Sequence, residues 1–274
     1  MAINFRSNTI IKNLRVGPLS GGGNGGGDSF ITDGLTAHYD IGNTLSYSGT
    51  GNTITDLTGN GNELQLAGLP TGYYQGSGDS AFLRLESGEA RFYYLGPVST
   101  TTLDIAGDID FSYSWWLLQG SLYGGGSDTY LSVNQSSQNS SNFRLNLIYN
   151  KPTHPNASYA NTYSVSFRRQ NGGTTDLVVS PPAGFDYSTD WGNFTITVSA
   201  AAGLKLYING QATTTVVEYD NTAPLPGDIP SGNTFSGHYA RYVDGYAQSA
   251  IYNRALSSSE VLQNFNALKS RYGY

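Results

Sequence analysis

Two pairs of carboxylates have a spacing that suits acid–base chemistry on a glycosidic bond. Glu86 and Glu89 are separated by Ser-Gly, and Asp108 and Asp110 lie just ahead of an apolar segment. A glycoside hydrolase requires two carboxyl groups about 5–9.5 Å apart across a cleft, one of them with a raised pKa. The first pair has the composition of a hairpin turn, and loop aspartates are usually solvated. We therefore expect no catalytic site at either pair.

Metal-ligating residues are sparse. The chain has no cysteine, and neither an HxH nor an HExxH pattern is formed by its histidines, His38, His154 and His238. Asp56, Asn60 and Asn62 have the spacing of oxygen ligands in a calcium loop. They equally suit an Asx-stabilised turn between two strands, which we favour. The expectation is a protein without a cofactor, with calcium at this loop as the alternative.

Aromatic side chains suit sugar binding when they are exposed beside polar groups, because sugar C–H faces stack on rings and hydroxyls need hydrogen bonds. Tyr73 and Tyr74, in a predicted loop, are our candidate glycan contacts. Trp115 and Trp116 lie in FSYSWWLL, which we interpret as a core strand. Adjacent residues of a strand point to opposite faces, so one of the two faces away from the core, where a second layer could cover it. Other aromatic candidates are Tyr93, Tyr94, Tyr123, Tyr130 and Tyr159.

Composition places these residues in a globular β-rich chain. The 274 residues are 38% hydrophobic, 12% charged and contain 35 glycines, which suits many short strands joined by tight turns. No window approaches the roughly 18 apolar residues of a membrane span. The net charge of −6 divides into three bases without acids in residues 1–27, against eleven bases and twenty acids in the remainder. We expect neither a membrane span nor a nucleic-acid surface.

Period-two alternation dominates residues 30–252. Apolar residues at Phe143, Leu145, Leu147 and Tyr149 alternate with others such as Arg144 and Asn146, and similar patterns cover 163–168, 194–198 and 204–208. Such alternation predicts antiparallel strands half covered by a second sheet. Asn209-Gly210 predicts a type I′ hairpin turn. About a dozen strands with this spacing favour one β-sandwich over separate domains.

The C-terminal segment predicts one amphipathic helix. Ser257 and Glu260 form a capping box. The apolar stripe is predicted to contain Val261, Leu262, Phe265 and Leu268. Lys269 and Arg271 lie at the negative end, and Gly273 ends the helix. A single amphipathic helix must pack on the strands that precede it.

The N-terminal segment divides into an arm, residues 1–16, and a Gly-rich linker, residues 17–29. In residues 21–27 six of seven are glycine, so the linker is a flexible tether that reaches about 40 Å when extended. The arm has no signal-peptide pattern. It is a frayed tail, or an anchor that docks in a groove or adds a strand to a partner's sheet. We favour the anchor, formed by Ile3, Phe5, Arg6, Ile10, Ile11, Lys12, Leu14, Arg15 and Val16.

Three segments of the body, residues 30–274, carry a family resemblance. GLTAHYDIGNTLSYSGTGNTITDLTGNGNELQL (34–66), WGNFTITVSAAAGLKLYINGQ (191–211) and AIYNRALSSSEVLQNFNALKSRYG (250–273) resemble laminin G-like, concanavalin A-like domains of phage structural proteins. The resemblance implies an all-β, two-sheet antiparallel jelly-roll sandwich with six or seven strands per sheet. It places the closing helix across one edge or end. The ExDxxE motif of related glucanases is absent, and residues 247–250 lack the acidic residue often found there.

The resemblance implies a non-enzymatic structural protein of a tailed-phage virion, either a capsid decoration or a tail appendage. The arm would bind other virion proteins, and the sandwich would adhere to host-surface polysaccharide. We expect a homo-oligomer that assembles in the bacterial cytoplasm and resides in the virion. The alternatives are a free carbohydrate-binding lectin module and, disfavoured by the missing motif, a polysaccharide hydrolase.

Overall fold

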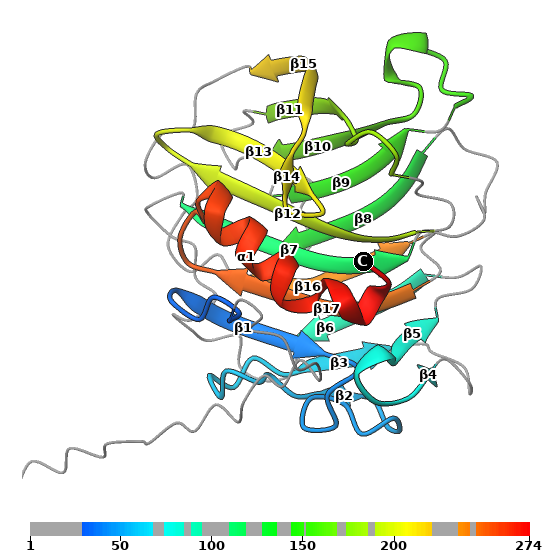
Figure 1. Cartoon of the computed structure of the whole chain (residues 1–274), viewed down its shortest axis with the longest axis vertical. Coiled ribbons are helices and arrows are strands. Elements are labelled where there is room, and N and C mark those ends of the chain that lie inside the picture. The colour runs from blue at the N-terminus through cyan, green and yellow to red at the C-terminus, as the bar shows by residue number, and fades with distance from the viewer. Residues whose placement is uncertain are drawn as a thin grey trace, which may run out of the picture.

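A computed structural model describes residues 29–67, 74–84, 89–94, 110–118, 128–135, 144–150, 152–168, 174–185, 190–220, 235–241 and 245–274. Within these ranges the chain forms two antiparallel sheets and one α-helix (Figure 1). The predicted all-β sandwich with a single C-terminal helix is confirmed. The predicted arm and the linker up to residue 28 lie outside the described residues. Short 3-10 turns are η1 Gly78–Ser80, η2 Ala157–Tyr159 and η3 Lys269–Tyr272.

The first sheet has eight strands, seven of which follow the order β14-β13-β12-β7-β17-β5-β4. The eighth, β1, pairs with β17 beyond the short stretch that β5 occupies. The strands are β1 Leu35–Asp40, β4 Tyr74–Gln75, β5 Phe82–Arg84, β7 Phe111–Leu118, β12 Trp191–Ser199, β13 Gly203–Ile208, β14 Gln211–Ala212 and β17 Gly245–Tyr252.

The second sheet has nine strands in the order β15-β11-β10-β9-β8-β16-β6-β3-β2. Both sheets exceed the predicted six or seven strands, in part because two-residue strands (β2, β4 and β14) extend their edges. The strands of this sheet are β2 Thr53–Ile54, β3 Leu64–Ala67, β6 Glu89–Tyr94, β8 Asp128–Gln135, β9 Arg144–Asn150, β10 Thr162–Arg168, β11 Thr174–Ser180, β15 Thr214–Asp220 and β16 Phe235–Arg241.

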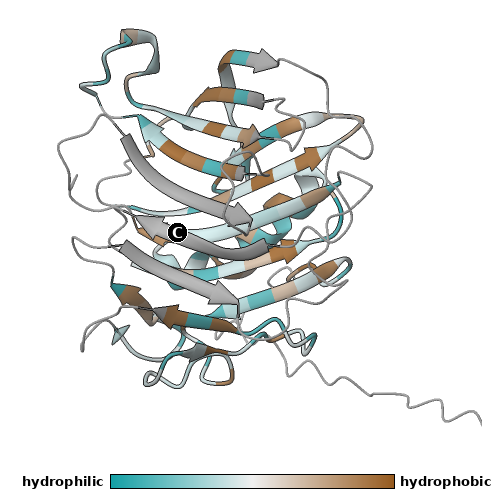
Figure 2. Cartoon of the chain, turned by 180° about the vertical axis from the view of Figure 1, so that it is seen from behind, coloured by the Kyte–Doolittle hydropathy of each residue, from teal (hydrophilic) through white to brown (hydrophobic). Residues whose placement is uncertain are grey.

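The main core lies between the two sheets. Alternate residues of each strand point to the inner face of its sheet and are buried, as the period-two pattern predicts. Hydrophilic and hydrophobic residues accordingly alternate along the strands (Figure 2). The four predicted apolar series, apart from the undescribed Phe143, enter this core with Leu145, Leu147, Tyr149, Tyr163, Val165, Phe167, Phe194, Ile196, Val198, Leu204, Leu206 and Ile208.

The helix α1, Ser258–Leu268, builds a second core on the outer face of the eight-stranded sheet (Figure 1). Trp116 points out of β7 to this side, and its ring stacks on Phe265 and Tyr272 at centroid distances of 5.7 and 4.0 Å. Trp115 points to the opposite face and enters the main core. The helix therefore covers a sheet face, and its predicted position at an edge or end is wrong.

The predicted helix residues are confirmed with one exception. Ser257 and Glu260 form the capping box, and Val261, Phe265 and Leu268 are buried. Leu262 is 43% exposed. The buried position beside Phe265 belongs to Asn264, so the stripe is narrower than predicted and contains an amide. Gly273 ends η3 in the left-handed conformation, at φ 90°.

Two predicted turns have different outcomes. Asn209 and Gly210 have φ of 53° and 74° and join β13 to β14, which confirms the hairpin. The prediction of a hairpin at Glu86-Ser-Gly-Glu89 is wrong, because β5 and β6 belong to different sheets.

Candidate functional site

The outer face of the nine-stranded sheet is the open face of the sandwich. The helix, η3 and residues 29–34 cover the corresponding face of the eight-stranded sheet, where they bury Trp116 and Tyr252. On the outer face of β9, β10 and β11 most of the described side chains are partly exposed, and Asn150, Thr162 and Val178 are buried. We call the outer face of the nine-stranded sheet the open face.

Polar residues predominate among the described side chains of the open face. Asn146, Ser164, Ser166 and Asp176 are partly exposed there. The amide nitrogen of Asn150 donates to the hydroxyls of Thr162 and Ser164 at 2.9 and 2.7 Å. Asn150 and Thr162 are buried, so the groups available to a sugar hydroxyl are the partly exposed amide, hydroxyl and carboxylate groups. Two apolar positions, Ile148 and Val178, interrupt them.

The strand register extends this face across the whole sheet. One row of directly paired residues runs through Ala67, Arg91, Tyr239, Ser132, Asn146, Ser166, Asp176 and Tyr219. The next row runs through Gln65, Tyr93, Gly237, Asn134, Arg144, Arg168 and Thr174. Tyrosine, asparagine, serine and arginine dominate both rows.

The candidate glycan contacts Tyr73 and Tyr74 do not belong to these rows. Tyr73 lies outside the described residues. Tyr74 is in β4, at the edge of the other sheet, and is half buried with its ring 5.8 Å from that of Tyr47. Of the other aromatic candidates, Tyr93 is in the second row and Tyr130 is paired with Ile148 on the open face. A glycan contact at Tyr73 and Tyr74 stays a prediction.

The loop of Asp56 is an Asx-stabilised turn. The Asp56 carboxylate accepts hydrogen bonds from the backbone N–H groups of His38 and Thr58, at 3.0 Å each, and from the Thr58 hydroxyl at 2.7 Å. Asn60 and Asn62 donate their amide nitrogens to the carbonyl of Thr36 at 3.0 Å. The carboxylate and amides satisfy the backbone around them, which is the structural interpretation that we favoured over calcium.

His38 lies in a buried polar cluster on the covered face. Its Nε2 is 2.6 Å from the amide nitrogen of Gln248, and its ring stacks on Phe30 at a centroid distance of 5.0 Å. Burial lowers the pKa of His38, an effect that outweighs the nearby carboxylates of Asp40 and Asp56. The buried imidazole, stacked on Phe30 and in contact with Gln248, is a packing residue.

Of the carboxylates that were considered for acid–base chemistry, Asp110 has a described hydrogen bond. Asp110 accepts a hydrogen bond from the backbone N–H of Ala200 at 2.8 Å and fastens the turn between β12 and β13. Glu89 is paired in register with Arg241. Glu86 and Asp108 lie outside the described residues. Among the residues that the structure describes, no three His, Cys, Asp or Glu side chains gather as a metal site would require.

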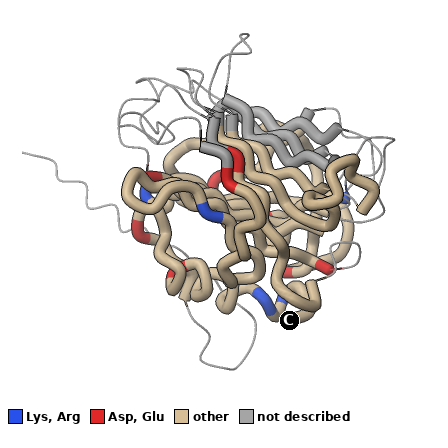
Figure 3. Tube along the Cα trace, turned by 90° about the horizontal axis from the view of Figure 1, so that it is seen from above, with Lys and Arg blue, Asp and Glu red and all other residues tan. Residues whose placement is uncertain are grey.

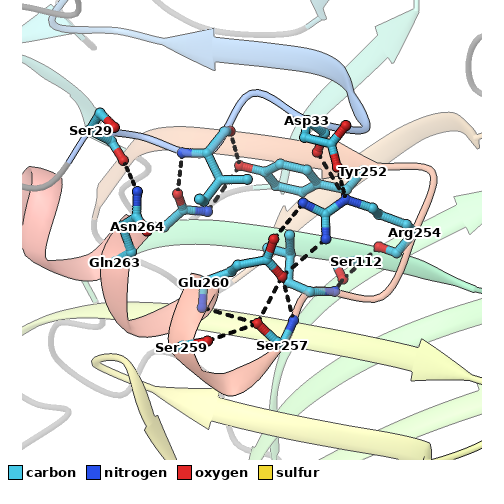
Figure 4. A network of polar contacts seen from close by, with 12 residues as sticks. Ser29, Asp33, Ser112, Tyr252, Arg254, Ser257, Ser259, Glu260, Gln263 and Asn264 are labelled. Carbon is cyan, nitrogen blue, oxygen red and sulfur yellow. Dashed lines mark hydrogen bonds and ion pairs between the residues drawn. The ribbon is translucent and has the colours of Figure 1, made fainter.

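A polar network fastens the first described residues to the helix (Figure 4). Gln263 donates to the carbonyl of Ser29 at 2.6 Å, and Asn264 accepts from the N–H of Ile31 at 2.8 Å. The Tyr252 hydroxyl donates to the carbonyl of Ile31 at 3.0 Å. The chain therefore enters the sandwich beside α1, on the side opposite to the open face. The predicted anchoring residues between Ile3 and Val16 lie outside the described residues.

Charges are thinly scattered along the described chain (Figure 3). Arg254 contacts Glu260 through two hydrogen bonds of 3.0 and 2.6 Å and Asp33 at 2.9 Å. These pairs link the helix cap to the N-terminal segment (Figure 4). The described helix is too short and too polar to cross a bilayer.

Comparison with known proteins agrees with this architecture. The family model described as the concanavalin A-like lectin/glucanases superfamily matches residues 95–262. No curated protein sequence matches the chain significantly. Similar solved structures include the binding domain of Paraclostridial Mosquitocidal Protein 1, with a TM-score of 0.52 and 17% identity over 85% of this chain and 52% of that one.

Two further similar structures contain sugars. The botulinum neurotoxin serotype D ligand binding domain in complex with N-acetylneuraminic acid has a TM-score of 0.54 and 14% identity, over 86% of this chain and 51% of that one. Domain 4 of AbnA, an extracellular arabinanase from Geobacillus stearothermophilus, in complex with arabinotriose has a TM-score of 0.53 and 16% identity, over 85% and 98%. This chain thus spans about half the length of the toxin binding domains that it matches.

Proposed function

This chain belongs to the concanavalin A-like lectin/glucanases superfamily, and we propose that it binds glycans on its open face without catalysing a reaction on them. The observation that carries the proposal is the difference between the two outer faces. One is sealed by α1 over Trp116. The other has partly exposed polar side chains on three adjacent strands, Asn146, Ser164, Ser166 and Asp176. The sugars in complex with two similar proteins support the same ligand class.

A steric block in the middle of the open face tests this proposal. Ser166 is in the first row on β10, and Ser166→Trp places a bulky ring between Asn146 and Asp176. Binding of the full chain to a glycan array is expected to be lost in this variant. Ser270→Trp, at an exposed position of η3 on the opposite side, is the matched control and should bind as the original protein does. Binding is expected to persist in a metal chelator.

Other outcomes of that experiment would contradict the proposal in distinct ways. Loss of binding in Tyr73→Ala or Tyr74→Ala, with Ser166→Trp unaffected, would move the site to the β4 edge. Turnover of a β-glucan by the purified chain would show a hydrolase instead. The hydrogen bond from the Ala200 N–H to the Asp110 carboxylate supports the non-catalytic alternative.

The second part of the proposal concerns where the protein acts. We propose that it is a structural or appendage protein of a tailed-phage virion, assembled as a homo-oligomer in the bacterial cytoplasm and anchored by residues 1–16. The basic arm, the glycine run of residues 21–27 and the acidic remainder support this division of the chain. The position of Ser29 beside α1 also supports it, because a tether that starts there leaves the open face directed away from the anchor.

Deletion of residues 1–27 tests the anchoring. The shortened chain is expected to keep its melting temperature and its glycan binding but to separate from virus particles in a density gradient. Co-purification of the shortened chain with particles would contradict an anchoring role of the arm.

A further inference from the structure

The first described residues form a strap on the covered face of the sandwich. We call residues 29–33 the strap. They belong to neither sheet, and side chains of α1 and of residues 252–254 hold them in place (Figure 4). The Gly-rich linker ends at residue 29, so tension in the linker reaches the fold at the strap.

The middle of the strap is held through the backbone of Ile31. Asn264 accepts from its N–H at 2.8 Å, and the Tyr252 hydroxyl donates to its carbonyl at 3.0 Å. The Asn264 amide also donates to the Tyr252 hydroxyl at 2.9 Å, so the two side chains act together. Gln263 adds a hydrogen bond of 2.6 Å to the carbonyl of Ser29. All of these contacts come from side chains rather than from a strand ladder.

One buried ring fixes the strap to the sheet beneath it. Phe30 is 9% exposed and stacks on His38 at a centroid distance of 5.0 Å. It belongs to the second core together with Trp116, whereas Ile31 is only partly buried. Opening the strap must withdraw Phe30 from this core, and the apolar surface that is then exposed to water resists the opening.

Arg254 marks the end of the strap. Its Nε donates to the carbonyl of Asp33 at 3.1 Å and lies 2.9 Å from the Asp33 carboxylate. Two hydrogen bonds to Glu260 hold the guanidinium in place. The chain turns at Gly34, with φ of 74°, so close to Arg254 that a Cβ atom there would lie 2.9 Å from the Arg254 Cγ. Arg254 therefore covers the turn that leads into β1.

The strand β1, which follows this turn, is held along both edges. It pairs with β17 on one edge. On the other edge, Asp56 accepts from the N–H of His38 at 3.0 Å, and the Ser46 hydroxyl accepts from the N–H of Asp40 at 3.1 Å. The buried ion pair of Asp40 with Arg271 closes the far end of β1. A segment held by a few side chains has a lower local stability than a strand held in this way.

Resting on the proposed anchoring by residues 1–16, we infer that the strap detaches reversibly under tension before the sandwich unfolds. The opening starts at Ser29 and ends at the turn beneath Arg254. Five freed residues lengthen the tether by at most about 18 Å. The two sheets, and with them the open face, stay folded while the strap yields.

Single-molecule stretching tests this order of events. The chain has no cysteine, so Ser7→Cys in the arm and Ser166→Cys on the open face provide two unique attachment points. The full chain is expected to show a short reversible extension, of at most about 18 Å, at a lower force than the unfolding of the sandwich. A single rupture without an earlier step would overturn the inference.

Variants assign the first step to the strap. Phe30→Ala and Gln263→Ala are each expected to lower its force but not the force of sandwich unfolding, because the strap has already detached by then. Gln211→Ala, at an exposed position of β14, removes the same amide elsewhere and should change neither force. Arg254→Gln should lengthen the first step, because the turn into β1 loses its cover. An unchanged first step in both strap variants would overturn the assignment.

Hydrogen exchange measures the same opening without applied force. Exchange of the Ile31 N–H should be insensitive to low concentrations of urea, because a local opening exposes little surface. The N–H groups of Ala37 and Tyr39 in β1 should instead follow the urea dependence of global unfolding. Gln263→Ala should speed exchange at Ile31 about fivefold through the loss of one hydrogen bond. The same urea dependence at Ile31 and in β1 would contradict a separate opening of the strap.

The strap and the anchoring fail separately. An absent first step, with binding to virus particles intact, would overturn the detachment of the strap alone. Particle binding that survives deletion of residues 1–27 would overturn the anchoring on which the inference rests, whatever the stretching shows.

Discussion

Arg271 in η3 donates both terminal guanidinium nitrogens to the carboxylate of Asp40 in β1, at 2.8 Å each. The two residues are 231 positions apart, and their side chains are only 10% and 5% exposed. The Arg271 Nε also donates to the carbonyl of Asp79 at 2.7 Å. This buried contact fastens η3 to β1, a strand of the eight-stranded sheet.

Asp40→Asn is therefore expected to lower the free energy of unfolding by about 3–5 kcal/mol, because it leaves the buried guanidinium without its counter-charge. Urea unfolding measures the loss. The double variant Asp40→Leu with Arg271→Met should recover most of it. Asp33→Asn is the control, since it breaks the exposed Arg254–Asp33 pair, in which Asp33 is 87% exposed, and should cost less than about 1 kcal/mol. Equal losses in the two single variants would contradict this account.

The helix cap is expected to give an acid-dependent stability. The Arg254 guanidinium, followed by hydrogen bonds from Ser257, lowers the pKa of Glu260 from 4.5 to about 2. A lowered pKa in the folded state means that the contribution is complete above pH 4.5 and is lost as the pH falls toward 2. Ser257→Ala should cost about 1 kcal/mol at pH 7.

Glu260→Gln removes the negative charge but keeps a side-chain oxygen that can accept the hydrogen bonds of the cap. The variant therefore distinguishes the contribution of the charge to stability from that of the hydrogen bonds. Its melting temperature should be lower than that of the original protein at pH 7, and the two should converge toward pH 2. A constant difference between the two melting curves over this range would show that the charge of Glu260 does not contribute.

The protonation of His38 is expected to give a second pH dependence of stability, at higher pH than that of Glu260. Burial keeps the pKa of His38 below its ordinary value of 6.5, so the unfolded chain binds more protons than the folded one below that pH. Stability should therefore be complete above pH 6.5 and decline as the pH falls below it. The groups around the ring are Phe30, Asp40, Asp56, Gln248 and Arg271.

Melting temperatures between pH 7.5 and 5 check this expectation. His38→Gln should flatten the profile, because it removes the titrating group. His154→Gln, in the loop between β9 and β10, is the matched control and should keep the original slope. An unchanged slope in His38→Gln would assign the decline to another group.

The features that could be predicted from the sequence are those that local residue patterns determine. Alternation identified the residues that enter the main core, and the capping box fixed the start of α1. The burial of Asn264 was missed, because its partners Tyr252 and Ile31 belong to distant segments and an amide is normally read as exposed. The ion pair of Arg271 was also missed, because its partner Asp40 is 231 positions away in β1. From the sequence, Arg271 was interpreted only as a charge at the end of the helix.

The candidate site depends even more on strand order. Alternation places Arg144, Asn146 and Tyr239 on strand faces, but the rows exist only because β16 inserts between β8 and β6. That insertion makes Tyr239 a neighbour of both Ser132 and Arg91, which are far from it in sequence. Sequence reasoning favoured Tyr73 and Tyr74 instead, because they lie in a predicted loop between Gly72 and Gln75. The arginines and tyrosines at alternate positions of several strands could have indicated this face from the sequence.

Two glycines in the same conformation allow the contact between the β13–β14 hairpin and α1 to be isolated. Gly203 and Gly210 have φ of 71° and 74°. A Cβ atom at Gly203 would meet no atom within 4 Å, whereas one at Gly210 would lie 3.0 Å from the Leu262 Cδ1 and the Phe265 Cβ. Gly203→Ala should lower the free energy of unfolding by about 1–2 kcal/mol through left-handed strain alone.

Gly210→Ala carries the same strain and in addition forces α1 away from the hairpin, so its loss should be larger. The difference between the two variants in urea unfolding measures the packing of the hairpin on the helix. Trp116 lies beneath α1 and stacks on Phe265, so its fluorescence should change in Gly210→Ala and remain unchanged in Gly203→Ala. Equal losses and identical spectra would show that the helix accommodates the added methyl group.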